Sequence, residues 1–190
     1  MSDAPLAIVM GCSAGGMSAL RTVLSGLRKD LSLPIIVVCH TGSDDITTFC
    51  ELVDTSSTLP VREARERQPA LPGVVHMAPA GYHLLLERDG KFSLSVDERI
   101  AFSRPAIDVL FESAASAYTT GLIGVVMTGA NSDGASGLAA IRAHGGVAIV
   151  QDPASAHASA MPQAALDIAG ADHCVPLDAI ASLLNHLCPQ

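Results

Sequence analysis

Uninterrupted aliphatic runs constrain the fold of this chain more than any other feature of its 190 residues. Four of them are LAIVM from residue 6, PIIVVCH from residue 34, GLIGVVMTG from residue 121 and GVAIVQD from residue 146. Because the apolar residues do not alternate with polar ones, each run predicts a strand that is buried on both faces. A segment with helical spacing follows each run. This alternation predicts a three-layer α/β/α fold with a mostly parallel, doubly wound sheet.

The middle of the chain has a different pattern. Residues 73–98 contain a DG turn at 89–90 between two strand-like segments, which predicts an antiparallel β-hairpin at the edge of the sheet. A predicted helix with Pro105 near its first turn comes next. Its apolar stripe consists of Ile107, Leu110 and Phe111. The sequence contains no repeat, low-complexity tract or linker, so we expect one domain over residues 1–190.

The overall composition excludes several classes of function. With 19 acidic and 11 basic residues the formal charge is −8, which disfavours binding to nucleic acid or to an anionic membrane surface. No apolar run is long enough to span a bilayer and no signal-peptide pattern is present, so we expect a cytoplasmic protein. The five cysteines form no CxxC motif, and the seven histidines show no metal-binding spacing. We therefore expect buried free thiols and neither a metal nor a cofactor.

One chemically active side chain follows each of three predicted strands. Ser13 lies in the glycine-rich turn GCSAGG, His40 ends PIIVVCH, and Asp133 lies in the turn TGANSDGASG. In a doubly wound sheet, reactive groups gather beyond the carboxyl ends of the strands. A serine hydroxyl needs a base to become a nucleophile, and the base needs an acceptor that orients it. Together, the three residues predict a Ser-His-Asp catalytic triad.

Taken singly, each residue has a plainer interpretation. Ser13 and Asp133 can cap the helices that follow them, and His40 can be a satisfied polar residue at a strand end. A dinucleotide-binding loop is a further alternative for the first turn, but Ser13 interrupts the GxGxxG pattern and no acidic residue ends the second strand. His83 is interpreted as structural, with a role beside the substrate as the alternative. The cysteines that precede Ser13 and His40 are interpreted as packing residues.

Several motifs of this sequence resemble, in order and spacing, those of one known family. They are GCSAGGMSAL, IIVVCH, APAGYHLLLERDG, SRPAIDVLF, VVMTGANSDGASGLAAIRAHGG and QDPASAHASAMPQAAL, and the resemblance covers about residues 5–180. The chain thus resembles the catalytic domain of the CheB-type chemotaxis protein-glutamate methylesterases. The resemblance implies hydrolysis of glutamate γ-methyl esters, and deamidation of certain glutamines, on the cytoplasmic helices of chemoreceptors.

The resemblance also implies roles for individual residues. By position, Ser13 matches the family's nucleophile, His40 its base and Asp133 its orienting acid. The backbone N–H of Ala130 matches a donor of the oxyanion site, and that of Ala14 is a second candidate donor. The family usually carries an N-terminal phospho-receiver domain. We expect none here, so the resemblance suggests a separate response-regulator protein as a partner.

The sequence departs from the family's pattern around the predicted site. Residues 39–42 read CHTG where the family usually has QHMP, and residues 129–131 read GAN where it usually has GMG. Ala14 stands where Thr is common. Because the triad is intact and the surrounding loops differ, the departures bear on the substrate more than on the chemistry. Two alternatives remain: a CheB-like interaction module with little or no activity, and a small-molecule esterase with the same triad.

Overall fold

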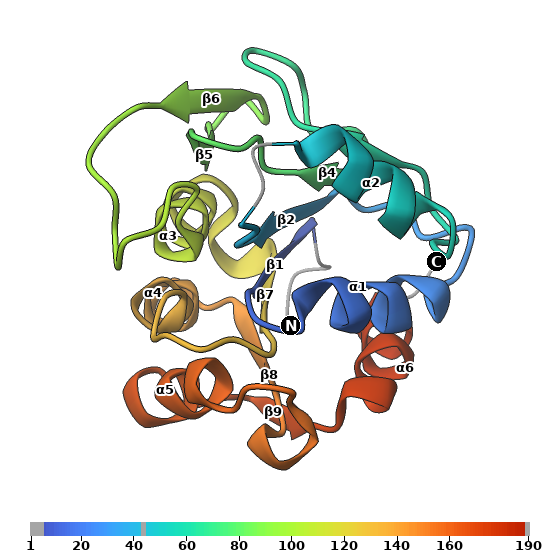
Figure 1. The fold of residues 1–190 in the computed structure, drawn as a ribbon, viewed down its shortest axis with the longest axis vertical. Coiled ribbons are helices and arrows are strands. Elements are labelled where there is room, and N and C mark those ends of the chain that lie inside the picture. The colour runs from blue at the N-terminus through green and yellow to red at the C-terminus, as the bar shows by residue number, and fades with distance from the viewer. Residues whose placement is uncertain (1–5, 43–44, 189–190) are drawn as a thin grey trace.

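The computed structural model describes residues 6–42 and 45–188, and a parallel sheet forms the centre of this part of the chain (Figure 1). The order of its seven strands is β3-β4-β2-β1-β7-β8-β9, and every neighbouring pair is parallel. The strands are β1 (Ala7–Cys12), β2 (Ile35–Cys39), β3 (Val61–Glu63), β4 (Val75–Met77), β7 (Leu122–Val126), β8 (Val147–Gln151) and β9 (His173–Val175). The four aliphatic runs form β1, β2, β7 and β8, which confirms the predicted doubly wound α/β fold.

Helices cover both faces of the sheet (Figure 1). One face carries α1 (Gly16–Ser25), α2 (Ile46–Asp54) and α6 (Leu177–Leu187), and the other carries α3 (Ile107–Tyr118), α4 (Ala135–Ala143) and α5 (Ala160–Ile168). Successive side chains of β1 enter different cores, because Ile8 and Met10 belong to the first cluster and Ala7 and Val9 to the second. A strand buried in this way needs an uninterrupted apolar sequence.

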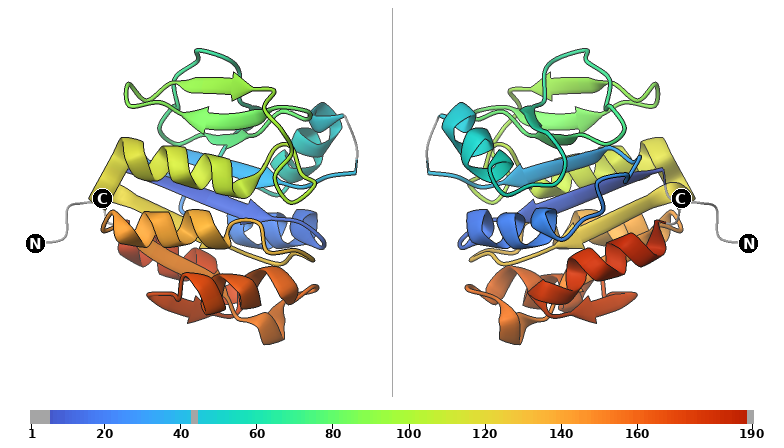
Figure 2. Two further views of the ribbon diagram at one scale, coloured as in Figure 1. Left: turned by 90° about the vertical axis from the view of Figure 1, so that its left-hand side faces the viewer. Right: turned by 90° about the vertical axis from the view of Figure 1, so that its right-hand side faces the viewer.

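The predicted hairpin is present as β5 (His83–Leu86) and β6 (Phe92–Ser95), which pair antiparallel. It forms a two-stranded sheet of its own and does not extend the ladder of the main sheet. Figure 2 shows the hairpin stacked beside α3. Its buried residues Leu84, Leu86 and Phe92 share a core with that helix, and this burial holds the hairpin in place.

Most of the cysteine thiols are buried, as the sequence predicts. All five thiols are free; four are buried, but Cys174 is exposed, contrary to the prediction of buried thiols.

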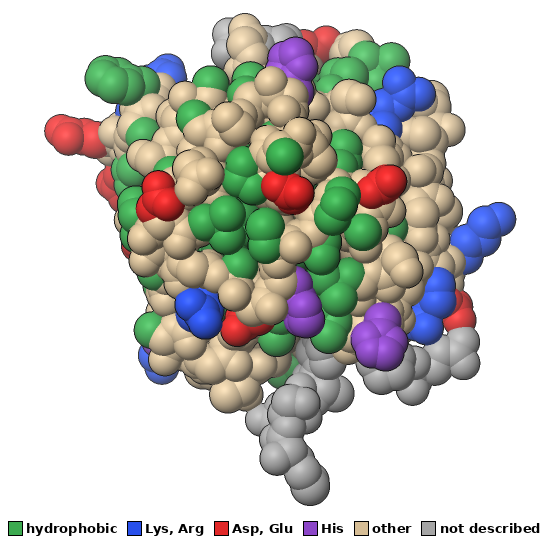
Figure 3. All heavy atoms as spheres, turned by 90° about the horizontal axis from the view of Figure 1, so that it is seen from below, with side chains coloured by type: hydrophobic (Ala, Val, Ile, Leu, Met, Phe, Trp, Pro, Cys, Tyr) green, Lys and Arg blue, Asp and Glu red, His purple; other side chains and the backbone are tan. Residues whose placement is uncertain are grey.

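Figure 3 shows the face at the β9 end of the molecule, whose middle carries hydrophobic and acidic side chains. Within residues 6–42 and 45–188, no helix is both long and apolar enough to cross a membrane.

Gly11 allows the start of α3 to approach the centre of the sheet. A Cβ atom at this position would overlap Ile107, the first residue of α3. The Gly11→Ala variant is therefore expected to lose about 1–3 kcal/mol of unfolding free energy, because the added methyl group overpacks a closed core. Urea unfolding measures the loss.

A matched double variant separates this contact from a general strand effect. In the Ile107→Ala background the overlapping side-chain atoms are gone, so adding Gly11→Ala should cost much less than it does in the wild-type chain. Equal costs in the two backgrounds would show that the close approach does not cause the destabilisation.

Candidate active site

The loop between β1 and α1 holds Ser13 in a tight turn. The Ser13 N–H donates to the carbonyl of Thr128 (2.9 Å), and the Ser13 carbonyl accepts from the N–H of Gly16 (2.7 Å). Gly15, with φ of 79°, is the N-cap of α1, and no side-chain hydrogen bond caps this helix. The helix-cap interpretation of Ser13 is therefore wrong.

His40 follows β2 directly and contacts the carboxylate of Asp133. The His40 N–H donates to the carbonyl of Cys12 (3.0 Å), which places the imidazole beside the end of β1. Its Nε2 lies 2.8 Å from Oδ2 of Asp133. Because an ionised carboxylate only accepts hydrogen bonds, Nε2 carries the proton and Nδ1 is left with a lone pair.

Backbone N–H groups at the N-terminus of α3 bind the Asp133 carboxylate. It is 1 % exposed, and it accepts the N–H groups of Ile107 (2.7 Å) and Asp108 (2.9 Å) as well as the imidazole. The N-cap of the following helix α4 is Gly134, and no side-chain hydrogen bond caps that helix. The interpretation of Asp133 as a cap of its own helix is therefore wrong; it caps a helix from another part of the chain, whose dipole favours its negative charge.

The Nδ1 atom of His40 has one hydroxyl neighbour among the described hydrogen-bond contacts, Ser103. Ser103 Oγ lies 3.4 Å from it, a long contact for a hydrogen bond. Ser13 and His40 line one cleft of about 840 Å³, and in the described part of the chain the Ser13 hydroxyl has no hydrogen-bond partner. The structure thus joins His40 to Asp133 and brings Ser13 into the same cleft without a direct Ser13–His40 bond. Such bonds are often long or absent before substrate binds.

The candidate oxyanion donors lie on two loops that are tied together. Within the described residues, the N–H groups of Ala14 and Ala130 donate no hydrogen bond, so the fold does not use either of them. Thr128 Oγ1 donates to the carbonyl of Ala14 (2.8 Å), which links the loop after β7 to the loop after β1. Next to Ala130, Gly129 is fixed by backbone bonds to Ala158 (3.0 Å) and Met161 (2.9 Å).

For His83, the sequence left open a structural role and a role beside the substrate, and its contacts are structural. His83 is 1 % exposed, its Nε2 lies 2.9 Å from the carbonyl of Glu98, and its Nδ1 accepts the N–H of Ala106 (3.1 Å). It therefore anchors both ends of the segment that carries Ser103.

Four polar residues near the site were not found from the sequence: Ser103, Asp108, Thr128 and Gln151. Buried Thr128 and Gln151 bond to each other, since the Thr128 N–H donates to Gln151 Oε1 (2.9 Å). Each lies at the end of an apolar run, and a polar residue at such a place is a usable signal. Ser103 and Asp108 had no comparable signal, because their partners are distant in sequence.

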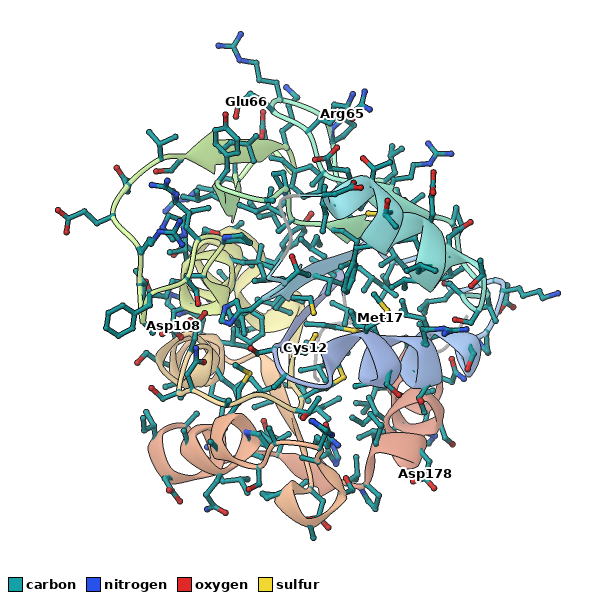
Figure 4. The ribbon with its side chains drawn as sticks, in the orientation of Figure 1. Cys12, Met17, Arg65, Glu66, Asp108 and Asp178 are labelled. Carbon is teal, nitrogen blue, oxygen red and sulfur yellow. The ribbon has the colours of Figure 1, made fainter. Side chains whose placement is uncertain are left out.

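Asp108, which is labelled in Figure 4, forms a reciprocal arrangement with Asp133 between α3 and α4. Asp108 Oδ1 accepts the N–H groups of Gly134 (3.0 Å) and Gly137 (2.7 Å) at the start of α4, while Asp133 accepts those at the start of α3. Burial, with the nearby charges of Asp133 and Glu112, raises the pKa of Asp108 to about 6.

This raised pKa makes stability depend on pH. In the unfolded chain an aspartate has a pKa of about 3.9, so between that pH and about 6 the folded protein binds the additional proton. Stability from Asp108 is therefore full below about pH 4 and is lost as the pH rises through 6. We expect a loss of about 1 kcal/mol, because solvent screens a partly exposed carboxyl group.

The Asp108→Asn variant should remove this slope and keep an oxygen acceptor for both glycine N–H groups. Urea unfolding of the wild type and the variant between pH 4 and pH 7 measures how the stability of each protein depends on pH. The difference in unfolding free energy between the two proteins should shift in favour of the variant as the pH rises; a constant difference would contradict the assignment.

The doubly wound parallel sheet, with a serine, a histidine and an aspartate at its carboxyl edge, is the architecture of an α/β hydrolase. The family model described as CheB methylesterase matches residues 8–184, and the chain belongs to this family.

Individual relatives give the same result. A protein from Leptospira interrogans is 44 % identical over 181 residues, covering 95 % of this chain and 94 % of its own, and its name assigns it provisionally as a protein-glutamate methylesterase/protein-glutamine glutaminase. A Symbiobacterium thermophilum protein, named protein-glutamate methylesterase/protein-glutamine glutaminase, is 34 % identical, and the match covers 94 % of this chain but 49 % of that protein. The crystal structure of the Thermotoga maritima CheB methylesterase catalytic domain superposes with a TM-score of 0.92 at 30 % identity, covering 97 % of this chain and 99 % of that one.

Proposed function

We propose that this chain hydrolyses the γ-methyl esters of glutamate side chains in chemoreceptors, and deamidates certain glutamines, through Ser13, His40 and Asp133. The observation that carries the proposal is the 2.8 Å contact between His40 and Asp133. It leaves Nδ1 as the basic nitrogen beside the cleft that Ser13 also lines. The names of the relatives support protein-bound glutamate and glutamine as substrates.

The first half of the reaction forms an acyl-enzyme. His40 Nδ1 takes the proton of the Ser13 hydroxyl as Oγ attacks the ester carbonyl. The N–H groups of Ala14 and Ala130 hold the negative oxygen that develops, and losing one such donor costs about 3 kcal/mol of barrier. The imidazolium then protonates the leaving group, and methanol departs. A glutamine substrate would release ammonia at the same step.

The second half regenerates the enzyme. His40 takes a proton from water as the water oxygen attacks the acyl carbonyl, and Ser13 leaves with that proton. Asp133 accepts the Nε2–H hydrogen bond throughout, which fixes the tautomer and stabilises the imidazolium. These steps require no cofactor.

The physiological setting belongs to the same proposal. The substrates would be the cytoplasmic helices of methylated chemoreceptors, which places the protein in the cytoplasm, and a separate response-regulator protein would be its second partner. Support comes from the family membership and from the cleft of about 840 Å³ that Ser13 and His40 line.

A non-catalytic interaction module is the second candidate. The observation in its favour is that, within the described residues, His40 Nδ1 contacts Ser103 Oγ (3.4 Å) and forms no hydrogen bond with Ser13 Oγ.

Release of methanol from methylated receptor fragments separates the two candidates. The wild-type chain should release methanol stoichiometrically with the loss of methyl ester, and the Ser13→Ala variant should not. Binding of the fragments without release by the wild type would support the interaction module.

A further inference from the structure

The cleft that contains Ser13 and His40 continues along α1. Five of its lining residues come from one face of that helix: Met17, Ser18, Arg21, Thr22 and Ser25. Figure 4 shows Met17 on the side of α1 that faces α2. On the opposite wall lie Phe49 of α2 and Ser56, which follows the end of α2. The cleft is therefore a trough between two helices, with the catalytic residues at one end.

Arg21 is the distinctive polar group of this trough. Among the described residues that line it, no other lysine, arginine or carboxylate occurs. The Nε of Arg21 donates to Ser56 Oγ (3.1 Å), which holds the guanidinium across the trough. Within the described residues, its two terminal nitrogens have no partner. By contrast, the hydroxyls of Thr22 and Ser25 donate to carbonyls of their own helix.

The charge of Arg21 predicts the charge of the ligand. The chain has a formal charge of −8, so an arginine without a carboxylate partner in a cleft is an exception to the acidic composition. A guanidinium with two unused donor groups is suited to a carboxylate, which it can bind through two parallel hydrogen bonds. The trough is thus complementary to an anionic side chain at the end away from Ser13.

The geometry of α1 gives the separation between the two ends. With a rise of about 1.5 Å per residue, Arg21 lies about 8 Å beyond the first residue of α1, and Ser13 lies in the turn before that residue. Ser56, to which the guanidinium is bonded, lies beyond the far end of α2. Along the axis of α1, Arg21 is therefore roughly 10 Å from the catalytic end. In an α-helical ligand this distance is two turns, about seven residues on one face.

A helix fits this trough better than an extended chain. Its walls are two neighbouring helices, its lining includes the apolar Met17 and Phe49, and an amphipathic helix packs into such a groove with one face. Apart from Cys39, which ends β2 and pairs with Cys12 of β1, the described lining residues come from helices and loops, so they offer no unpaired strand edge to an extended peptide.

We infer that the trough along α1 binds one helix of the substrate, and that Arg21 selects a carboxylate seven residues from the glutamate ester held at Ser13. The inference rests on the proposed function and names the substrate feature that the same site recognises. Arg21 is a specificity-determining residue and takes no part in the chemical steps.

Helical peptides with one glutamate γ-methyl ester test the inference. The residue seven positions before or after the ester is Glu in one peptide set and Gln in the other, with the rest of the sequence unchanged. We compare the wild type, Arg21→Gln, Arg21→Lys and Arg88→Gln; Arg88 is exposed in the hairpin turn outside the trough, so it controls for the change in net charge. The readouts are kcat and KM for methanol release at low salt.

We expect KM to rise only when the Arg21→Gln enzyme acts on a Glu peptide. Arg21→Gln should raise KM about fivefold for a Glu peptide with little change in kcat, and the difference should shrink at high salt. Arg21→Lys should retain most of the preference, and Arg88→Gln should behave like the wild type. Equal effects of Arg21→Gln on Glu and Gln peptides, or no effect on either, would overturn the inference.

A binding measurement separates this inference from the proposed function. Fluorescence anisotropy of labelled peptides on Ser13→Ala, with and without Arg21→Gln, reports recognition without turnover. Selective loss of Glu-peptide binding supports the inference even where the wild type releases no methanol, in which case the proposed function alone fails. Methanol release with no Arg21-dependent discrimination leaves the proposed function standing and overturns the inference.

Discussion

Replacing Ser13 by alanine is expected to abolish ester hydrolysis, with a fall in kcat on the order of 10⁴-fold or more. The hydroxyl supplies the oxygen that forms the acyl-enzyme, and neither Ala14 nor His40 can replace it. The fold should be unaffected, because the turn is held by backbone bonds from Ser13 to Thr128 and from Gly16 to Ser13. Methanol release gives the rate, and urea unfolding should give a stability within about 0.5 kcal/mol of the wild type.

Ser116→Ala is the matched control for this variant. Ser116 is an exposed serine on α3 whose hydroxyl donates to the carbonyl of Glu112 on its own helix. It should retain wild-type activity. If Ser13→Ala hydrolysed the ester at a comparable rate to this control, Ser13 would not be the nucleophile.

The Asp133→Asn variant is expected to lower kcat by as much as roughly 10⁴-fold, as in other triads. The carboxylate accepts three N–H groups, from His40 and from the first two residues of α3. An asparagine has one acceptor oxygen and an NH₂ group, so it cannot accept all three. If its NH₂ faces the imidazole, Nε2 becomes the acceptor and the proton moves to Nδ1, the atom that must take the proton of Ser13.

The same substitution is expected to lower stability by about 1–3 kcal/mol, because a buried N–H at the start of α3 loses its acceptor. KM should change little, since Asp133 acts on the imidazole and not on the substrate. The rates are measured as methanol release and the stability by urea unfolding.

Asp54→Asn provides the comparison for Asp133→Asn. Asp54 also accepts a backbone N–H, from Val61 (2.8 Å), but through a single bond that the asparagine oxygen can replace. It should lose little activity. An Asp133→Asn enzyme within tenfold of the wild-type kcat would contradict the orienting role of the carboxylate.

The fold could be predicted from the sequence where strands are long and buried on both faces. The runs that form β1, β2, β7 and β8 are such strands. In contrast, β3, β4 and β9 have three residues each, and sequences as short as VRE or HCV carry no periodic signal. The hairpin was found from its turn, but its separation from the main sheet depends on tertiary packing against α3.

The site residues that lie just beyond the end of a strand could be predicted from the sequence. Because β1 lies between β2 and β7, the residues that follow these three strands come together at one edge. The capping interpretations of Ser13 and Asp133 were wrong because local spacing does not reveal that glycines occupy both cap positions. The pairing of Asp108 with α4 joins two helices about 25 residues apart in sequence, so only the structure shows it.

The most direct test of the proposed chemistry is to identify the serine that a fluorophosphonate ester labels. Such a reagent forms a covalent adduct with a serine activated by a neighbouring base, and mass spectrometry of the digested protein locates the adduct. Ser103 is the competing hydroxyl, since its Oγ lies 3.4 Å from Nδ1 of His40. We predict one adduct, on the peptide that contains Ser13, and none in Ser13→Ala. An adduct on Ser103, or an unlabelled but folded wild-type protein, would contradict a Ser13–His40–Asp133 hydrolase.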